Sequence, residues 1–335
     1  MSSQIHRLAT YNVLSSHLCE PDYFKSCDRT NLDPEIRLER ITKKLIPEIE
    51  QETIILLQEI STLWAGKLHS FFVNHNYYLI TGLYGTPKNG YMGVATALPI
   101  NRYEILDVKI ERLTDSRDWS KLQQFEVTWR QWLKKIADQL NIKNKLEHPQ
   151  HYAQRRFNQY IFVKVKDKVS QETFTLMNYH MPCVFFVPQV MTIHSAMIAQ
   201  RTEILSQDCP FLLAGDFNIR PQSPQYQLLT TGKIPSNHPH YPLLLKDDPW
   251  QPNLKSALKS AYYEFLGKEP DFTNYSKIKD KDPFIDTLDY IWLSDHWQVK
   301  EVLPLPTQQQ LTGFLPNEIE PSDHLLLRAN MTINH

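Results

Sequence analysis

Four short apolar segments, each ending in polar residues, constrain the fold of this chain more than any other feature. They read IHRLATYN, TIILLQE, FTLMNYH and PFLLAGDFN, and they end at Asn12, Glu59, His180 and Asn218. Short runs of this apolar character are typical of buried strands. Polar groups that follow such strands commonly line the functional edge of an α/β sheet. We therefore expect the four strand ends to converge on one site.

Helical patterns lie between and after these strands. Asp33 and Pro34 form an N-cap and first-turn pair, and apolar residues then recur at helical spacing in a helix that is strained or ended near Pro47. Further elements are expected as helices over 188–205, 223–229 and 254–265, and as strands over 288–293, 299–303 and 325–329. This order of elements predicts a two-sheet core flanked by helices.

We expect a single domain over residues 1–335, because 41% apolar content in 335 residues can form one large core. The stretch 117–140 differs from the rest, because its aromatic and aliphatic residues mark one face of a long charged helix. That spacing favours helix packing over a base-stacking role for Phe125, Trp129 and Trp132. We interpret this region as a helical insertion near 111–155.

Composition excludes several classes of protein. The 36 basic and 37 acidic residues nearly balance, so net charge does not favour long polynucleotides or an anionic membrane. Nine glycines form no Gly-rich phosphate loop, so side chains and metal must hold any bound phosphate. Four cysteines without a CxxC pair, and an amino terminus without an apolar signal segment, predict an intracellular, cytoplasmic protein with no membrane span.

The candidate site is rich in hard oxygen ligands. Glu59, Asp216 and Asp323 supply carboxylates, and Asn12 and Asn218 supply amide oxygens. This set selects Mg²⁺, or alternatively Mn²⁺, over zinc, and phosphoester hydrolysis is the matching chemistry. Each residue alone has a structural explanation, such as an Asx-turn, a helix cap or a surface ion pair. Their joint occurrence favours the catalytic interpretation.

Two other groups of residues stay open or take the structural interpretation. His238 and His240 form an H-x-H pair, but the surrounding prolines and the lack of a nearby acidic or cysteine partner favour a plain loop. Arg155 and Arg156 are either a solvated pair or phosphate clamps. The sequence does not choose between these two roles.

The motifs TYNVL, LLQEI, NYH, GDFN, TLDYIW and PSDH occur in an order that resembles the endonuclease/exonuclease/phosphatase superfamily, which includes deoxyribonuclease I. Within it, FTNY at 272–275 before TLDYIW is similar to the nocturnin, Angel and deadenylase branch. The resemblance covers about Arg7 to Asn330. It implies a four-layer α/β sandwich, in which two packed mixed β-sheets lie between helices, and a magnesium site at one edge.

The resemblance also implies a role for each matching residue. Asn12, Glu59 and Asp323 would lie at the metal. Asp216 would orient or deprotonate the attacking water, Asn218 would hold the nucleophile or phosphate, and His180 would donate to a phosphoryl oxygen. His324 would contact the scissile phosphate while Asp289 fixes its tautomer. The substrate-binding residues would be Asn178, Phe272 and Asn274, with Phe272 as base platform or, equally, as core.

Several functions fit this resemblance. The first is a magnesium-dependent phosphodiesterase that trims RNA or oligoadenylate from the 3′ end, and the second is a nocturnin-like 2′-phosphatase acting on a dinucleotide such as NADP. A lipid phosphatase or sphingomyelinase is disfavoured, because this sequence has no evident membrane-inserting segment. A catalytically silent binding module is also disfavoured, because it would need a substituted site residue. The partner expected is a nucleotide or short RNA, and no obligate protein partner is inferred.

The apolar segment HMPCVFFVPQ after Tyr179 departs from relatives, which often carry polar substrate contacts there.

Overall fold

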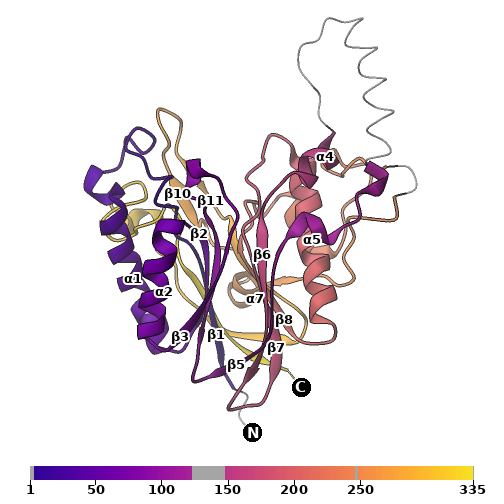
Figure 1. The fold of residues 1–335 in the computed structure, drawn as a ribbon. Coiled ribbons are helices and arrows are strands. Elements are labelled where there is room, and N and C mark those ends of the chain that lie inside the picture. Colours follow the sequence, from indigo (N-terminus) through magenta and orange to yellow (C-terminus); the bar gives the residue numbers. More distant parts are fainter. Residues whose placement is uncertain (1–3, 123–147, 246–247, 335) are drawn as a thin grey trace, which may run out of the picture.

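Two six-stranded sheets pack face to face in the computed structural model, which describes residues 4–122, 148–245 and 248–334 (Figure 1). The first sheet has the order β13 (Trp297–Val302), β14 (Leu327–Ile333), β1 (His6–Asn12), β2 (Ile54–Ile60), β4 (Gly93–Pro99) and β3 (Tyr77–Leu83). The second has the order β5 (Tyr103–Arg112), β6 (Gln159–Asp167), β7 (Thr173–Tyr179), β8 (Phe211–Asp216), β12 (Asp289–Leu293) and β9 (Lys259–Ser260). Each sheet is mixed, because β1–β2 and β7–β8 are parallel while their neighbours pair antiparallel.

Helices cover the outer faces of both sheets (Figure 1). On the first sheet these are α1 (Pro34–Glu50) and α2 (Thr62–Asn74), and on the second α4 (Pro149–Gln154), α5 (Pro188–Ser206) and α6 (Pro224–Thr231). The remaining elements are α7 (Ala261–Leu266), the hairpin of β10 (Asn274–Ser276) and β11 (Phe284–Asp286), and short 3₁₀ turns at Arg29–Leu32, Pro87–Asn89, Leu113–Ser116 and Gln308–Gln310. The predicted four-layer α/β sandwich is confirmed.

Apolar residues fill all three interfaces between these layers. Along β1, Leu8 packs between the two sheets and Ala9 packs against the helices of the first sheet, as strand alternation requires. On the other side, α5 is buried around most of its circumference and packs on β7 and β8. These layers hold the strand ends in fixed positions relative to one another.

The structure differs from the expected elements in two places. Helix α1 continues through Pro47 to Glu50, because Leu45 and Ile49 are buried against the sheet and Gln51 Nε2 donates to the Pro47 carbonyl at 3.1 Å. The helix expected over 254–265 begins only at Ala261, because the Leu258 N–H donates instead to the carbonyl of Leu229 within α6, at 2.8 Å. Of the helix expected over 117–140, residues 123–140 lie outside the described residues, as does the rest of the stretch to 147 within the expected insertion near 111–155.

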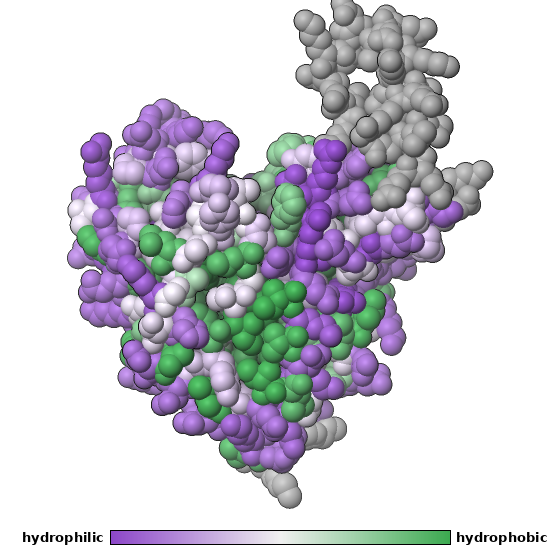
Figure 2. All heavy atoms as spheres, in the orientation of Figure 1, coloured by the Kyte–Doolittle hydropathy of each residue, from purple (hydrophilic) through white to green (hydrophobic). Residues whose placement is uncertain are grey.

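Both chain ends lie at the end of the sandwich opposite the β10–β11 hairpin (Figure 1). At the hairpin end, the space-filling view shows a notch between the two halves of the molecule (Figure 2). None of the helices within the described ranges has the length and apolar character to cross a bilayer.

Candidate active site

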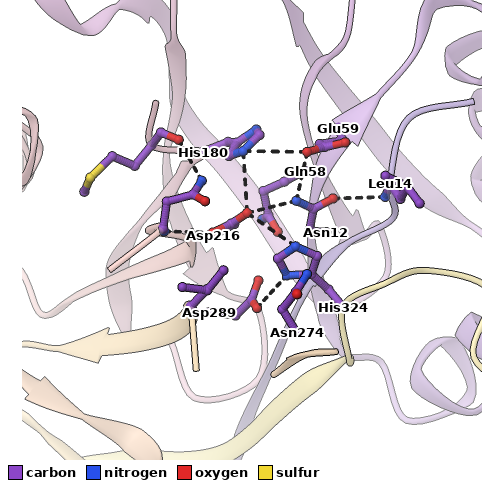
Figure 3. Close-up of polar contacts among 12 residues, drawn as sticks. Asn12, Leu14, Gln58, Glu59, His180, Asp216, Asn274, Asp289 and His324 are labelled. Atoms are coloured by element: carbon purple, nitrogen blue, oxygen red, sulfur yellow. Dashed lines mark hydrogen bonds and ion pairs between the residues drawn. The ribbon is translucent and has the colours of Figure 1, made fainter. Parts of the chain in front are cut away.

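A cavity of about 1020 Å³ opens where strands of both sheets end. Most of the residues expected in the site line this cavity, namely Glu59, His180, Asp216, Asn218, Asn274, Asp323 and His324. Asp289 lies directly behind His324 and contacts it, as the close-up shows (Figure 3). The prediction that distant segments converge on one acidic site therefore agrees with the geometry.

The parallel pair β7–β8 brings His180 and Asp216 together. His180 follows the last residue of β7, Asp216 ends β8, and the Met181 N–H donates to the Asp216 carbonyl at 2.8 Å. Gly215 is required here, because its φ is +146° and a Cβ would lie 1.9 Å from the Tyr179 carbonyl oxygen. This close approach leaves His180 Nε2 3.5 Å from Asp216 Oδ2.

Asp216 is buried among charged groups. Asn12 Nδ2 donates to its Oδ2 at 2.9 Å, and the Nε2 atom of His324 lies 3.7 Å from the same oxygen. Burial raises the pKa of Asp216 to about 6, the negative charge of Asp289 adds to the shift, and the imidazoles of His324 and His180 oppose it. The Asp216 carboxyl therefore stays largely ionised at physiological pH but takes up a proton more readily than an ordinary aspartate.

Glu59 reaches the cavity through an unusual backbone conformation. Its neighbours Leu57 and Gln58 follow strand alternation, so Leu57 packs under the helices and Gln58 faces the second sheet. Regular alternation would turn Glu59 toward the helices as well. Instead, Glu59 has φ 61° at a bulge in the β2–β4 ladder, a conformation that costs about 1–2 kcal/mol for a non-glycine residue. The Ser15 N–H then holds Oε2 at 3.0 Å.

His324 and Asp289 form a buried pair. Asp289 Oδ2 lies 2.8 Å from His324 Nδ1 and also accepts a 2.6 Å hydrogen bond from the Thr273 hydroxyl. Because a carboxylate accepts, Nδ1 carries the proton and Nε2 is left for the cavity. Burial alone would lower the pKa of His324, but Asp289, Asp216 and Asp323 outweigh it and raise the pKa well above its ordinary value.

Asp323 and Asn274 meet in the cavity wall beside His324, with which Asn274 pairs in an isolated β-bridge. Asn274 Nδ2 donates to Asp323 Oδ2 at 3.2 Å, whereas Asp323 Oδ1 is buried without a hydrogen-bond partner. Burial raises the pKa of the Asp323 carboxyl. An unsatisfied carboxylate oxygen beside a cluster of like charges is the environment in which a cation is most stabilising.

These groups fit a hard divalent ion. The carboxylates of Glu59 and Asp323 face one cavity, and Asp216, Asp289 and His324 present atoms within 4.8 Å of one another. Because Asp289 and His324 are hydrogen-bonded to each other, the carboxylates of Glu59 and Asp323 are the ones left to hold an ion. Cys183 also lines the cavity; although the residue is exposed, desolvation of its thiol raises its pKa to about 12, so the thiol is protonated at neutral pH.

The amide oxygen of Asn12 faces the backbone and its nitrogen faces the carboxylates, which differs from the orientation expected of a metal ligand. The Leu14 N–H can only donate, and it lies 2.9 Å from Asn12 Oδ1, which fixes the amide orientation. Its Nδ2 therefore points to the cavity and donates to both Glu59 Oε1, at 3.2 Å, and Asp216 Oδ2 (Figure 3). Asn12 links two carboxylates that would otherwise repel each other.

Asn178 and Phe272 do not line the cavity, which differs from the substrate-binding role expected for Asn178 and agrees with the core alternative for Phe272. Asn178 is fully buried, accepts from Gln58 Nε2 at 2.9 Å and donates to the Ala95 carbonyl at 2.8 Å, so it bridges the two sheets. Phe272 is 4% exposed and packs with Tyr275, Leu315 and Leu325 outside the cavity.

The H-x-H loop agrees with the structural interpretation. His238 Nδ1 accepts from the backbone N–H of His240 at 3.0 Å, so it is used within the loop. No described acidic or cysteine residue joins this pair in a metal-binding group, since the cluster detected in the described ranges is the one around Asp216.

Several residues that support the site were not singled out from the sequence. Arg37 is fully buried and its guanidinium donates to carbonyls of Val13, Leu14 and Pro321, at 2.6–2.7 Å. It therefore fixes the loop after Asn12 to the loop that precedes Asp323. Three further side chains hydrogen-bond to site residues. Asn158 donates to the His180 carbonyl, Thr273 to the Asp289 carboxylate, and Ser322 to the Asn12 carbonyl. The signals available were weak for Arg37 and Asn158, whereas Thr273 and Ser322 lie inside the FTNY and PSDH motifs.

Comparison with known proteins agrees with this geometry. The model of the Endonuclease/Exonuclease/phosphatase family matches residues 9–324. The solved structure of ANGEL2, described as a 2′,3′-cyclic phosphatase and determined with adenosine-2′,3′-vanadate, superposes with a TM-score of 0.74 at 18% identity, covering 100% of this chain and 97% of that one. At this identity the superposition shows the shared fold.

Curated relatives match a shorter stretch. Carbon catabolite repressor protein 4 homolog 4 of Arabidopsis thaliana is 36% identical over 126 residues, or 36% of this chain and 27% of the relative. Nocturnin of Xenopus laevis is 32% identical over 127 residues, or 37% of this chain and 28% of the relative. The matches thus span less than a third of these two relatives. With the family model matched almost end to end, this chain belongs to the Endonuclease/Exonuclease/phosphatase family, in the nocturnin, Angel and deadenylase branch.

Proposed function

We propose that this protein is a divalent-metal-dependent phosphoesterase that hydrolyses a phosphate ester of a nucleotide or RNA. The observation that carries the proposal is the cavity in which the Glu59, Asp216 and Asp323 carboxylates meet the buried Asp289–His324 pair. Carboxylates supply metal ligands and a base, and imidazoles supply donors to phosphoryl oxygens. Both kinds of group are needed in one place for phosphoryl transfer to water.

His324 is the proposed donor to the phosphoryl group. Asp289 holds Nδ1–H, and the surrounding carboxylates favour the charged imidazolium, so Nε2–H faces the cavity as a donor. His180 Nε2 lies on the other side of Asp216 and is suited to a second oxygen. Donors fixed before the reaction stabilise the charge that builds up on phosphate oxygens in the transition state.

Asp216 is the proposed base for the attacking water. Its pKa of about 6 is near the range in which a carboxylate accepts a proton effectively at neutral pH. Asn218 follows in the left-handed conformation, with φ 50°, and its Nδ2 donates to the Met181 carbonyl at 3.0 Å. The side chain of Asn218 is thereby fixed in the cavity wall, where its oxygen can accept a hydrogen bond from the water.

Magnesium is the proposed ion, with Mn²⁺ as the alternative, because the donor set is made of carboxylates. Glu59 and Asp323 would hold it. A bound divalent ion supplies positive charge to the phosphate oxygens and makes a water molecule more acidic. Asn12 contributes by holding Glu59 and Asp216 at hydrogen-bonding distance from one nitrogen.

The nucleobase is expected to contact aromatic residues other than Phe272. Phe157, Phe185 and Phe284 all line the cavity. Aromatic side chains recognise bases of any sequence by stacking, at about 1–3 kcal/mol per base. A cavity of this volume accommodates either a 3′-terminal nucleotide of RNA or a dinucleotide. We therefore favour a 3′-exoribonuclease or phosphodiesterase, and keep a 2′-phosphatase acting on NADP as the second candidate.

The test is hydrolysis by the purified full chain with Mg²⁺, measured on oligoadenylate and NADP in parallel. Release of adenosine monophosphate supports the first candidate, and release of inorganic phosphate from NADP supports the second. Chelation of the ion should abolish either activity. A protein that hydrolyses neither substrate, or that is equally active after chelation, would contradict the proposal.

Two substitutions separate the proposed roles. Asp216→Asn should lower kcat by about 10²–10⁴-fold while the protein stays folded, because only the base is lost. Glu59→Gln should shift the Mg²⁺ titration to higher concentration. Asp295→Asn is the matched control, since Asp295 is exposed and pairs with Lys259 away from the cavity. An active Asp216→Asn protein would overturn the assignment of the base.

A further inference from the structure

One arginine in the wall of the catalytic cavity has no carboxylate partner. Of the two neighbouring arginines whose role the sequence left open, Arg156 is half-buried and lines the cavity, whereas Arg155 is exposed and does not line it. Phe157 and Asn158 continue the same wall. The two arginines therefore have different surroundings, and only Arg156 is placed to meet a ligand.

The position of Arg156 is fixed by its neighbours. Its carbonyl accepts from Arg112 Nε at 2.9 Å, and its N–H donates to the Ala153 carbonyl at 3.1 Å. The guanidinium lies over the Tyr152 ring, with 4.3 Å between its central carbon and the ring centroid. Stacking of this kind limits the motion of an arginine while leaving the edge of the guanidinium for a planar acceptor.

The hydrogen-bonding capacity of Arg156 is not satisfied by the protein. Its Nε is buried without a partner, and no carboxylate of the described residues lies within ion-pairing distance of it. Arg220, also in the cavity wall, is by contrast paired with Asp286 at 2.9 Å, and the lining residue Lys281 is exposed. A guanidinium that is half-buried and unpaired is stabilised by an anion from solution.

Arg156 lies close to the reacting groups but is not part of them. Asn158, two residues further along, donates from Nδ2 to the His180 carbonyl at 2.8 Å. Two residues of extended chain span at most about 7 Å, so Arg156 flanks the side of the site on which His180 lies. The catalytic cluster already has His180, His324 and the proposed ion for the phosphate that is cleaved. An anion at Arg156 would be a different one.

We propose that Arg156 binds a second phosphate of the substrate, one that is not hydrolysed. This inference rests on the proposed function and narrows its substrate class to nucleotides that carry an additional phosphate group, as oligonucleotides and dinucleotides do. A fixed guanidinium suits this role, because its parallel N–H groups match two oxygens of one phosphate. Arg156 also supplies a positive charge that the neighbouring segment 182–188 lacks, because none of the side chains in that segment is charged.

The experiment compares, within each pair, a compound whose only phosphate is the one to be cleaved with a compound that carries further phosphate groups. The RNA pair is the diadenylate ApA and its 5′-phosphorylated form pApA, and the dinucleotide pair is adenosine 2′-phosphate and NADP. Because NADP also adds a nicotinamide riboside, the readout is the effect of the substitution on each compound. In Arg156→Gln, we expect kcat/KM to fall about 10- to 100-fold for pApA or NADP, mainly through KM, with little change for ApA or adenosine 2′-phosphate. Arg156→Lys, which keeps the charge without the planar geometry, should recover part of the loss.

Arg155→Gln is the matched control, since it removes the same charge one residue away from the cavity wall. Calorimetric binding of the four compounds to each variant, with thermal unfolding to verify folding, gives the same comparison without turnover. If the unmodified protein hydrolyses nothing but Arg156→Gln selectively weakens binding of pApA or NADP, the proposed function fails and the phosphate site stands. Equal losses on both members of a pair, or no loss on either, would overturn the role of Arg156.

Discussion

Replacing His194 with glutamine should make the protein less sensitive to mild acid. His194 lies on α5 and is fully buried, with Nδ1 2.8 Å from the Tyr179 hydroxyl and Nε2 3.2 Å from the Ala153 carbonyl. A carbonyl only accepts, so Nε2 carries the proton and Nδ1 accepts from Tyr179. Protonation of Nδ1 would break this hydrogen bond and leave an unpaired charge in the core.

The magnitude follows from the pKa of His194. Burial lowers this pKa from 6.5 to about 4, with smaller contributions from Arg156 and Arg112. Above pH 6.5 the imidazole is neutral in both the folded and unfolded states, so it adds no pH dependence. Below 6.5 the unfolded state takes up the proton and the folded state does not, so stability falls as pH falls. At about pH 5, roughly 1.5 pH units at about 1.36 kcal/mol each amount to a loss of about 2 kcal/mol.

The assay is urea unfolding of the unmodified protein and of His194→Gln near neutral pH and near pH 5. The unmodified protein should lose about 2 kcal/mol more than the variant over this interval, whatever the other titrating groups contribute, because they are common to both. His69→Gln, an exposed histidine on α2, serves as the control and should follow the unmodified protein. Parallel pH profiles for the unmodified protein and His194→Gln would refute the reasoning.

Arg37→Met should destabilise the protein and lower kcat, because it leaves three loop carbonyls without a hydrogen bond, at about 1–3 kcal/mol each. Urea unfolding measures the stability and steady-state kinetics measure kcat. An unchanged unfolding curve would contradict this prediction. Phe272→Ala should cost about 3–5 kcal/mol of stability with KM unchanged, because the ring is core. Phe284→Ala, in the cavity wall, should instead raise KM for the nucleotide with little loss of thermal stability.

The strand ends were predictable because a short apolar run followed by polar residues is a local signal in the sequence. Each of the four apolar runs became a buried strand, and the polar residues beyond them meet in the cavity. Local patterns also identified α1, α5 and α6. The side chains of Asp33 and Ser223 cap α1 and α6, and α5 begins with Pro188 in its first turn. Pro47 was misjudged because burial of the last turn against the sheet outweighs the missing hydrogen bond.

The directions of individual side chains were harder to predict, because they depend on backbone conformation and on distant partners. Asn178 was expected to bind substrate, but it lies within β7 and faces the other sheet, whereas His180 lies beyond the end of β7 and faces the cavity. Glu59 enters the cavity through its left-handed backbone, which a strand pattern does not reveal. Arg37 acts through Pro321, 284 residues away, so no local pattern marks it.

The two halves of the sandwich each hold an incomplete set of reacting groups. Asn12 and Glu59 come from the first sheet, His324 from the segment leading into β14, and His180, Asp216 and Asp289 from the second sheet. A fragment carrying either sheet alone could not turn over substrate. Heat inactivation should therefore coincide with the separation of the sheets, so that residual enzymatic rate serves as a sensitive gauge of whether the sandwich is intact.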